Sequence, residues 1–169
     1  MSNCSGIFVD RMSAFVGEVT GAEAEPNKSA YVFGELVMFD VFARRNSGVV
    51  IIESEMRRPG PVHNVIKAVR WAQTKHKQVQ MVHLFESSYF SEKTQRLQKE
   101  FAKFVGQLGG KALPNFDYEP IDFGMPNILF RHPKRHAKEI MSIADKVGEE
   151  IEQKGLLSLL AKYPKRGVI

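Results

Sequence analysis

The segment LVMFDVFARRNSGVVIIESEM, residues 36–56, carries the strongest structural signal in the sequence. It contains parts of two β-favouring segments, near 31–44 and 49–56, joined by Asn46-Ser47-Gly48, whose residue types suit a tight turn. With an even-numbered loop, Asp40 on the first strand lies opposite Glu53 on the second. Glu55 projects from the same face as Glu53, because side chains alternate along a strand. The sequence therefore predicts an antiparallel hairpin that gathers three carboxylates.

The segments around this hairpin predict the other elements. Apolar residues recur at spacings of three and four near 5–20, 62–76 and 91–108, which predicts three helices. A largely apolar run at 79–85 predicts a central strand, a fourth strand is expected within 116–130, and a last long helix is expected from Pro133 to about Lys154. The apolar stripes of the first three helices are Phe8, Met12, Phe15, Val16 and Val19, then Val62, Ile66 and Val69, then Leu97, Phe101, Phe104, Val105 and Leu108.

The order of these elements, αββαβαβα, predicts an α/β fold with a mixed sheet flanked by helices. Residues 25–29, which include Pro26 and Asn27, are expected to form a loop after the first helix. The length of 169 residues suits a single domain over 1–169. No apolar run reaches the ~20 residues that a membrane span needs, so no membrane contact is expected. The single cysteine and the absence of a signal-peptide pattern indicate a reduced, cytoplasmic protein.

The charge distribution points to a polyanionic partner. The chain carries a net charge of +5, and no acidic residue occurs between Met56 and Phe85. Clustered Lys and Arg bind phosphate backbones because they release condensed counterions. The alternative is that this basic stretch serves only solubility. The residues expected to bind nucleic acid, with DNA favoured over RNA, are Arg57, Arg58, Lys67 and Arg70.

The three carboxylates on the hairpin predict a metal site. Close packing of Asp40, Glu53 and Glu55 is costly unless a cation neutralises the charge or one carboxylate takes up a proton. Hard oxygen ligands at this density suit Mg²⁺ or Mn²⁺ rather than zinc. The alternative is that a Glu-x-Glu pair on a strand belongs to a solvated face or a protected sheet edge.

These residues resemble the metal site of a known superfamily. A helix with an acid, a β-hairpin that carries Asp and then Glu-x-Lys, and a following helix and strand form the core of the PD-(D/E)XK nucleases, which have the restriction-endonuclease-like fold. Asp40 followed by Ile51-Ile52-Glu53-Ser54-Glu55 is similar to that motif, in its Glu-x-Glu variant. The resemblance covers about residues 5–86, and residues 131–163 would be a C-terminal helical elaboration.

The resemblance implies roles for individual residues. Asp40 and Glu53 would hold the metal, and Glu18 would correspond to the additional acid on the first helix. Glu55 stands where the family usually has lysine, and Phe39 stands in place of the proline before the acid. Gln73 could hydrogen-bond a metal ligand or a metal-bound water, although a partly exposed glutamine at a helix end is the simpler interpretation.

The implied activity is that of an endonuclease, a hydrolase that cleaves phosphodiesters with Mg²⁺ or Mn²⁺. Asp40, Glu53 and Glu55 would be the catalytic residues, and double-strand cleavage would require a homodimer or a larger complex. The alternative is a non-catalytic basic α/β domain, a degenerate nuclease fold that binds nucleic acid or a partner subunit. His132 and His136 have a metal-binding spacing, but the surrounding Lys and Arg residues oppose cation binding.

Overall fold

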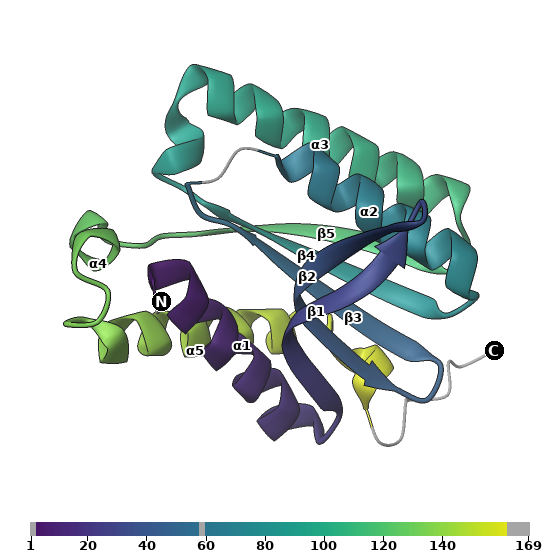
Figure 1. Cartoon of the computed structure of the whole chain (residues 1–169), viewed down its shortest axis with the longest axis horizontal. Coiled ribbons are helices and arrows are strands. Elements are labelled where there is room, and N and C mark those ends of the chain that lie inside the picture. Colours follow the sequence, from purple (N-terminus) through teal and green to yellow (C-terminus); the bar gives the residue numbers. More distant parts are fainter. Residues whose placement is uncertain (1–2, 58–59, 162–169) are drawn as a thin grey trace.

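The computed structural model describes residues 3–57 and 60–161 (Figure 1). Arg58, one of the residues expected to bind nucleic acid, lies outside them. The strands are β1 (Glu23–Val32), β2 (Glu35–Arg45), β3 (Gly48–Glu55), β4 (Gln78–Glu86) and β5 (Phe116–Phe123). The α-helices are α1 (Cys4–Thr20), α2 (Pro61–Lys75), α3 (Lys93–Ala112), α4 (Asn127–Arg131) and α5 (Ala137–Gln153), with short 3₁₀ turns η1 (Tyr89–Ser91) and η2 (Ser158–Leu160). None of these helices is both long enough and apolar enough to cross a membrane.

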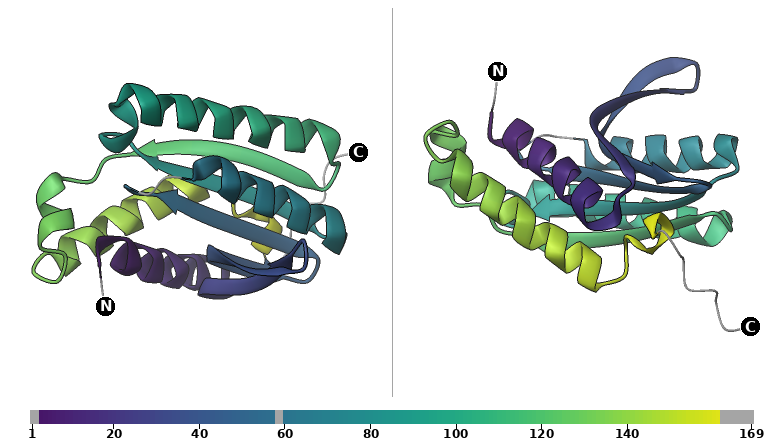
Figure 2. Two further views of the ribbon diagram at one scale, coloured as in Figure 1. Left: turned by 45° about the horizontal axis from the view of Figure 1, so that its top comes forward. Right: turned by 90° about the horizontal axis from the view of Figure 1, so that it is seen from below.

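The five strands form one mixed sheet in the order β1-β2-β3-β4-β5. The pairs β1–β2 and β2–β3 are antiparallel, and β3–β4 and β4–β5 are parallel. The helices α2 and α3 connect the parallel strands and cover one face, while α1 and α5 cover the other (Figures 1 and 2). The chain is therefore an α/β protein with a hydrophobic core on each side of a single sheet.

The strands β3 and β4 are apolar on both faces because helices cover both sides. Val50 and Ile52 of β3 pack towards α1 and α5, and Val49 and Ile51 pack towards α2. Glu53 and Glu55 continue the second set, so both carboxylates point to the α2 side of the sheet. The alternation along β3 thus carries two acids into the layer between the sheet and α2.

The hairpin of β2 and β3 agrees with the sequence prediction. Arg45 pairs with Gly48 across a two-residue loop, Asn46-Ser47, and Asn46 has a φ of 54°. The expected central strand at 79–85 is also confirmed, because β4 lies between β3 and β5. The helices expected near 5–20, 62–76 and 91–108 correspond to α1, α2 and α3.

Two features at the N-terminal side of the sheet differ from the prediction. The observed order is αβββαβαβαα, because the expected loop at 25–29 belongs to an additional strand, β1. Pro26 is tolerated there since β1 is an edge strand and the proline nitrogen needs no partner. The segment near 31–44 is split by a turn in which Phe33 and Gly34 have φ values of 53° and 78°. This turn produces the β1–β2 hairpin, which curves away from the sheet (Figure 2).

The C-terminal helix and two of the predicted apolar stripes also differ. The last long helix begins at Ala137 rather than Pro133, after the short helix α4. On α2 the buried apolar side chains are Val65, Ala68, Trp71 and Ala72, and Ile66 is exposed. On α3 the contact face consists of Ala102, Gly106 and Gly109, whereas Leu97, Phe101, Phe104 and Leu108 are exposed.

Candidate active site

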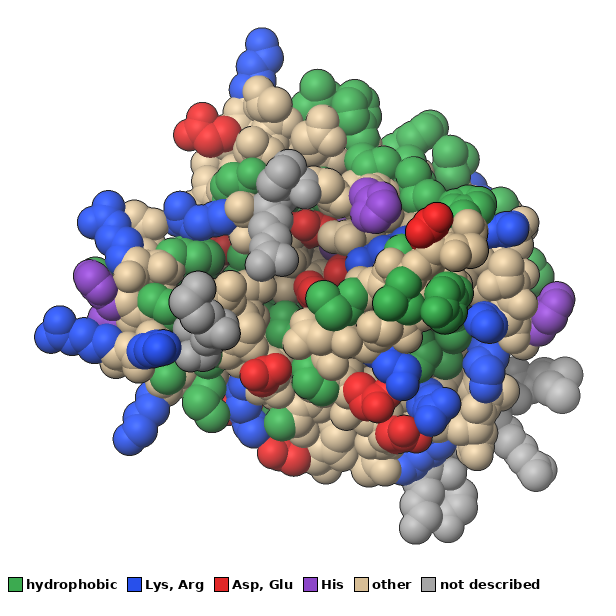
Figure 3. Space-filling model, viewed as in Figure 1, with side chains coloured by type: hydrophobic (Ala, Val, Ile, Leu, Met, Phe, Trp, Pro, Cys, Tyr) green, Lys and Arg blue, Asp and Glu red, His purple; other side chains and the backbone are tan. Residues whose placement is uncertain are grey.

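A cavity of about 280 Å³ opens where β3 ends beside the first turns of α2. Its charged lining consists of Asp40, Glu53, Glu55 and Lys67, with Ser5, Met38, Ser54, Gly60, His63 and Asn64 completing the wall. Figure 3 shows acidic and basic side chains in a recess near the middle of this face. The three carboxylates of the predicted metal site therefore line one cavity, together with a lysine.

Local backbone geometry places both walls of this cavity. Gly60, the residue before α2, has a φ of 120°, which a residue with a side chain rarely adopts. Pro61 then begins the helix at a position where its missing N–H costs nothing. Asn64 and Lys67 lie three residues apart on α2 and both face the ends of β2 and β3.

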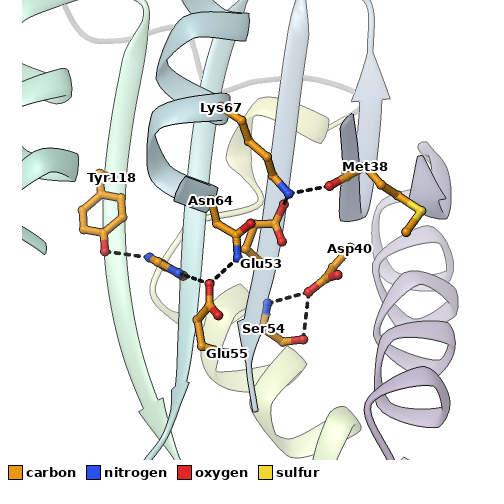
Figure 4. A network of polar contacts seen from close by, with 9 residues as sticks. Met38, Asp40, Glu53, Ser54, Glu55, Asn64, Lys67 and Tyr118 are labelled. Carbon is orange, nitrogen blue, oxygen red and sulfur yellow. Dashed lines mark hydrogen bonds and ion pairs between the residues drawn. The ribbon is translucent and has the colours of Figure 1, made fainter. Parts of the chain in front are cut away.

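Asp40 lies at the point where β2 and β3 separate. The last paired residues are Val41 and Ile52, so Asp40 is one step beyond the regular ladder, opposite Glu53. Its Oδ2 atom accepts hydrogen bonds from the Ser54 backbone N–H at 2.9 Å and from the Ser54 hydroxyl at 3.0 Å (Figure 4). The Asp40 carboxylate thus accepts the backbone N–H of Ser54 where the regular β2–β3 pairing ends, and this contact fixes the carboxylate at the cavity.

Glu53 and Lys67 form a buried ion pair. The relative exposure of Glu53 is 1% and that of Lys67 is 7%, and Lys67 Nζ lies 2.8 Å from Glu53 Oε1. Lys67 Nζ also donates a hydrogen bond to the carbonyl oxygen of Met38 (Figure 4). The contact between Lys67 Nζ and Glu53 Oε1 therefore pairs two opposite charges inside the cavity. Burial and the nearby Asp40 raise the pKa of Glu53 well above its ordinary value of 4.5, although Lys67 opposes this rise.

Glu55 is held by a different set of donors. Its Oε1 atom contacts His83 Nε2 at 2.9 Å and accepts a hydrogen bond from the side-chain amide of Asn64. His83 Nδ1 lies 2.9 Å from the hydroxyl of Tyr118 on β5, which completes a chain from β3 through β4 to β5. Burial is the largest effect on His83 and lowers its pKa, although Glu55 opposes the shift. A neutral imidazole fits this chain when Tyr118 donates to Nδ1 and Nε2–H donates to Glu55.

The residues fit a divalent metal only with two carboxylate ligands. No group of three or more His, Cys, Asp or Glu side chains within residues 3–57 and 60–161 is arranged to hold a metal ion. Glu55 is engaged with His83 and Asn64, which leaves Asp40 and Glu53 as candidate ligands. Glu53 Oε1 already lies 2.8 Å from Lys67 Nζ, so a divalent cation at Glu53 would share this carboxylate with the ammonium group. Mg²⁺ commonly binds one or two carboxylates and completes its coordination with water and phosphate oxygens.

The structure does not bring Glu18 or Gln73 to this cavity. Glu18 is near the end of α1 and forms an ion pair of 3.0 Å with Arg11, whereas Ser5, at the start of the same helix, lines the cavity. Ser5 and Glu18 are 13 positions apart, which corresponds to roughly 20 Å along the helix axis. Gln73 is exposed and accepts a hydrogen bond from Arg70 at 2.7 Å.

The basic residues expected to form one surface have separate contacts. Lys67 is inside the cavity. The Arg57 guanidinium lies 4.2 Å from the centre of the Phe130 ring and donates to Asn127 on α4. The guanidinium of Arg70 lies 4.9 Å from the ring of Phe33 at the tip of the β1–β2 hairpin. His136, at the start of α5, contacts Glu139 of the same helix at 3.1 Å.

Sequence reasoning missed Asn64, His83 and Tyr118, and it gave Lys67 a different role. His83 is the only ionisable residue within the apolar run 79–85, which is a signal for a buried functional group. Its partner, Glu55, is revealed only by the order of strands in the sheet. The parallel pairing of β3 with β4 places His83 beside Glu53, two residues from Glu55. The role of Lys67 depends on the rotation of α2, which the apolar pattern of that helix predicted incorrectly.

Comparisons with known proteins leave the assignment at the level of an α/β protein. No protein-family profile matches the chain, and no curated protein matches it. It is similar to a solved crystal structure of a protein of unknown function, AF1548, with a TM-score of 0.39 and 14% sequence identity. The match covers 89% of this chain and 98% of that chain, and a likeness this distant carries no argument about activity.

Proposed function

We propose that the cavity between β2, β3 and α2 hydrolyses phosphodiester bonds of nucleic acid with the help of Mg²⁺ or Mn²⁺. The fold would then be a restriction-endonuclease-like one. The observation that carries the proposal is the meeting of Asp40, Glu53 and Lys67 in one cavity, with Lys67 Nζ 2.8 Å from Glu53. A phosphodiester-cleaving site needs oxygen ligands for a cation and a positive charge near the phosphate, and both are present here.

Lys67 supplies the cation that the strand itself does not provide. In the Glu-x-Glu variant of the motif, Glu55 occupies the position where a lysine is usual, and a carboxylate cannot stabilise a developing phosphate charge. Lys67 reaches the same cavity from α2, and its ammonium group lies beside Glu53. We assign it to the scissile phosphate, where its charge would be most useful in the transition state.

The two carboxylates at the ends of β2 and β3 would hold the divalent cation. That cation, when bound, would polarise the phosphate and lower the pKa of a coordinated water. Asp40 is oriented for this role by the two hydrogen bonds from Ser54, and Glu53 is oriented by the ordered end of β3. Glu55 would orient the attacking water, because the bonds from His83 and Asn64 both go to its Oε1 atom and fix the group.

A second candidate function rests on the same ion pair. The Glu53–Lys67 pair neutralises part of the charge in the cavity without any bound ion. A protein with such an internally neutralised site could bind nucleic acid or a partner subunit without cleaving it. The net charge of +5 is compatible with this alternative, which predicts nucleic-acid binding that does not respond to the loss of Asp40.

Cleavage assays distinguish the two functions. Supercoiled plasmid DNA, single-stranded DNA and RNA are incubated with the protein and Mg²⁺ or Mn²⁺, and the products are separated on gels. Nuclease function predicts metal-dependent products for the wild type and a loss of at least about 100-fold in rate for Glu53→Gln. Glu18→Gln is the matched control, since this carboxylate is paired with Arg11 outside the cavity. A preparation that binds these substrates but cleaves none of them supports the non-catalytic alternative.

A further inference from the structure

The outer face of α3 carries a row of large apolar side chains in contact with solvent. Leu97, Phe101, Phe104 and Leu108 are between 48% and 61% exposed. They follow one another at spacings of four, three and four residues, which aligns them along one side of the helix. Figure 3 shows hydrophobic side chains along the edge of the molecule that α3 forms. We call these four residues the α3 seam.

The seam cannot turn inward, because the opposite face of α3 is fitted to the sheet and to α2. A Cβ atom on Gly106 would lie 2.5 Å from the ring of Tyr118, and one on Gly109 would lie 2.7 Å from Val69. Ala102, the next residue of this contact face, is fully buried. The helix therefore presents its small residues to the protein and its large apolar residues outward, the reverse of the usual arrangement in a monomer.

We propose that α3 pairs with α3 of a second copy of this chain, antiparallel and across a twofold axis. The sequence of the seam supports this occupant because it reads the same in both directions, as Leu-x₃-Phe-x₂-Phe-x₃-Leu. A twofold axis between Phe101 and Phe104 brings Leu97 against Leu108 of the other copy, and Phe101 against Phe104. A twofold interface must be self-complementary, and this seam is so in both spacing and residue type.

The positions beside the seam allow two copies to approach. At the helical positions that flank the apolar row, the chain has Gln98, Val105, Gln107 and one charged residue, Glu100. The two basic side chains near the row form ion pairs within the subunit. Lys99 pairs with Asp122 at 2.5 Å, and Lys103 pairs with Glu100 at 3.5 Å. Under the twofold axis Glu100 approaches the region of Gln107, so no like charges face one another.

The size of the seam indicates a dimer of modest strength. Large apolar side chains cover on the order of 150–250 Å² each, so four half-exposed ones leave roughly 300–500 Å² per subunit available. This is below the ~800 Å² per partner of a standard interface, which places the pairing among weak, reversible associations. We expect dissociation on dilution through the micromolar range. The inference does not depend on the proposed nuclease function, since α3 is separate from the cavity.

Charge-swap variants test both the surface and its geometry. Analytical ultracentrifugation of the wild type between about 1 and 200 μM should show a monomer–dimer equilibrium. Phe101→Lys and Phe104→Glu should each weaken self-association at least tenfold. Mixing these two variants should restore a heterodimer, because antiparallel pairing brings Lys against Glu and leaves one Phe–Phe contact. Leu36→Lys is the matched control, since Leu36 is an exposed apolar residue on the β1–β2 hairpin rather than on α3.

Far-UV circular dichroism and the melting temperature establish that each variant is folded. A wild type that stays monomeric at 200 μM would overturn the proposal and leave the seam to a partner of different sequence. A dimer that persists in Phe101→Lys would also overturn it, because its interface would then lie elsewhere. A mixture of Phe101→Lys and Phe104→Glu that associates no more strongly than either variant alone would contradict the antiparallel arrangement.

Discussion

Replacing Lys67 with methionine should leave Glu53 as a buried carboxylate without its counter-ion. Lys67 Nζ is 2.8 Å from Glu53 Oε1, and both side chains are almost completely buried. Removing one partner of such a pair costs about 3–5 kcal/mol when the remaining group stays charged. Glu53 can limit this cost by taking up a proton, because burial and Asp40 already raise its pKa. We expect a loss of about 3 kcal/mol at pH 8.

The pH dependence of this loss has a defined sign. A carboxylate with a raised folded-state pKa stabilises the protein below its ordinary value of 4.5, and this stabilisation is lost as pH rises through the folded-state pKa. Without Lys67 the pKa of Glu53 rises further, since Lys67 lowers it in the wild type. The destabilisation of Lys67→Met should therefore be smaller at pH 5 than at pH 8.

Urea denaturation at both pH values measures these free energies of unfolding. In a double-mutant cycle, Lys67→Met combined with Glu53→Gln should recover at least about 1.5 kcal/mol of the loss at pH 8, since no buried charge remains. Lys28→Met is the control, because Lys28 forms an exposed ion pair with Glu25 and should cost less than about 1 kcal/mol. Strictly additive effects of the two cavity substitutions would refute the coupling inferred from the structure.

Three further outcomes follow from the site and from α3. Mg²⁺ or Mn²⁺ at a hundredfold excess over its dissociation constant should stabilise the wild type by about 2.7 kcal/mol in a thermal-shift assay. Asp40→Asn should abolish this stabilisation without loss of the fold. Equal responses of the two proteins would exclude Asp40 as a metal ligand. Because the pKa of His83 is lowered in the folded state, its stabilising contribution is present above pH 6.5 and is lost as pH falls. In denaturation experiments, the free energy of unfolding of His83→Asn should therefore fall less between pH 6.5 and pH 5 than that of the wild type. Gly106→Ala should cost about 1–3 kcal/mol in urea denaturation because its Cβ would overlap Tyr118, whereas Gly124→Ala, which meets no neighbour within 4 Å, should cost little.

The centre of the fold could be predicted from the sequence because its signals are local. The Asn46-Ser47 turn between two β-rich segments set the pairing of β2 with β3, and the apolar run at 79–85 identified the central strand β4. Two signals were misleading. Pro26 and Asn27 are typical of loops, but an edge strand tolerates them, and Phe33 adopts a left-handed turn conformation that is uncommon for an aromatic residue.

The composition of the site depended on contacts that no local pattern contains. Asp40, Glu53 and Glu55 were identified because strand alternation and turn parity are short-range properties. His83 and Tyr118 become partners of Glu55 only through the order of strands in the sheet. The apolar stripe of α3 was correctly identified as a row, but its direction was not predicted, because the glycines on the other face determine how the helix packs.

A single-turnover cleavage assay determines whether Asp40, Glu53 and Lys67 form the proposed phosphodiester-cleaving site. Excess protein is mixed with end-labelled single-stranded and duplex oligonucleotides in Mn²⁺, and product formation is followed over time for the wild type, Glu53→Gln, Lys67→Met and Glu18→Gln. The site predicts metal-dependent cleavage by the wild type and Glu18→Gln, and rates at least about 100-fold lower for the two cavity variants. Cleavage at equal rates by all four proteins, or by none of them while each binds the oligonucleotides, would contradict it.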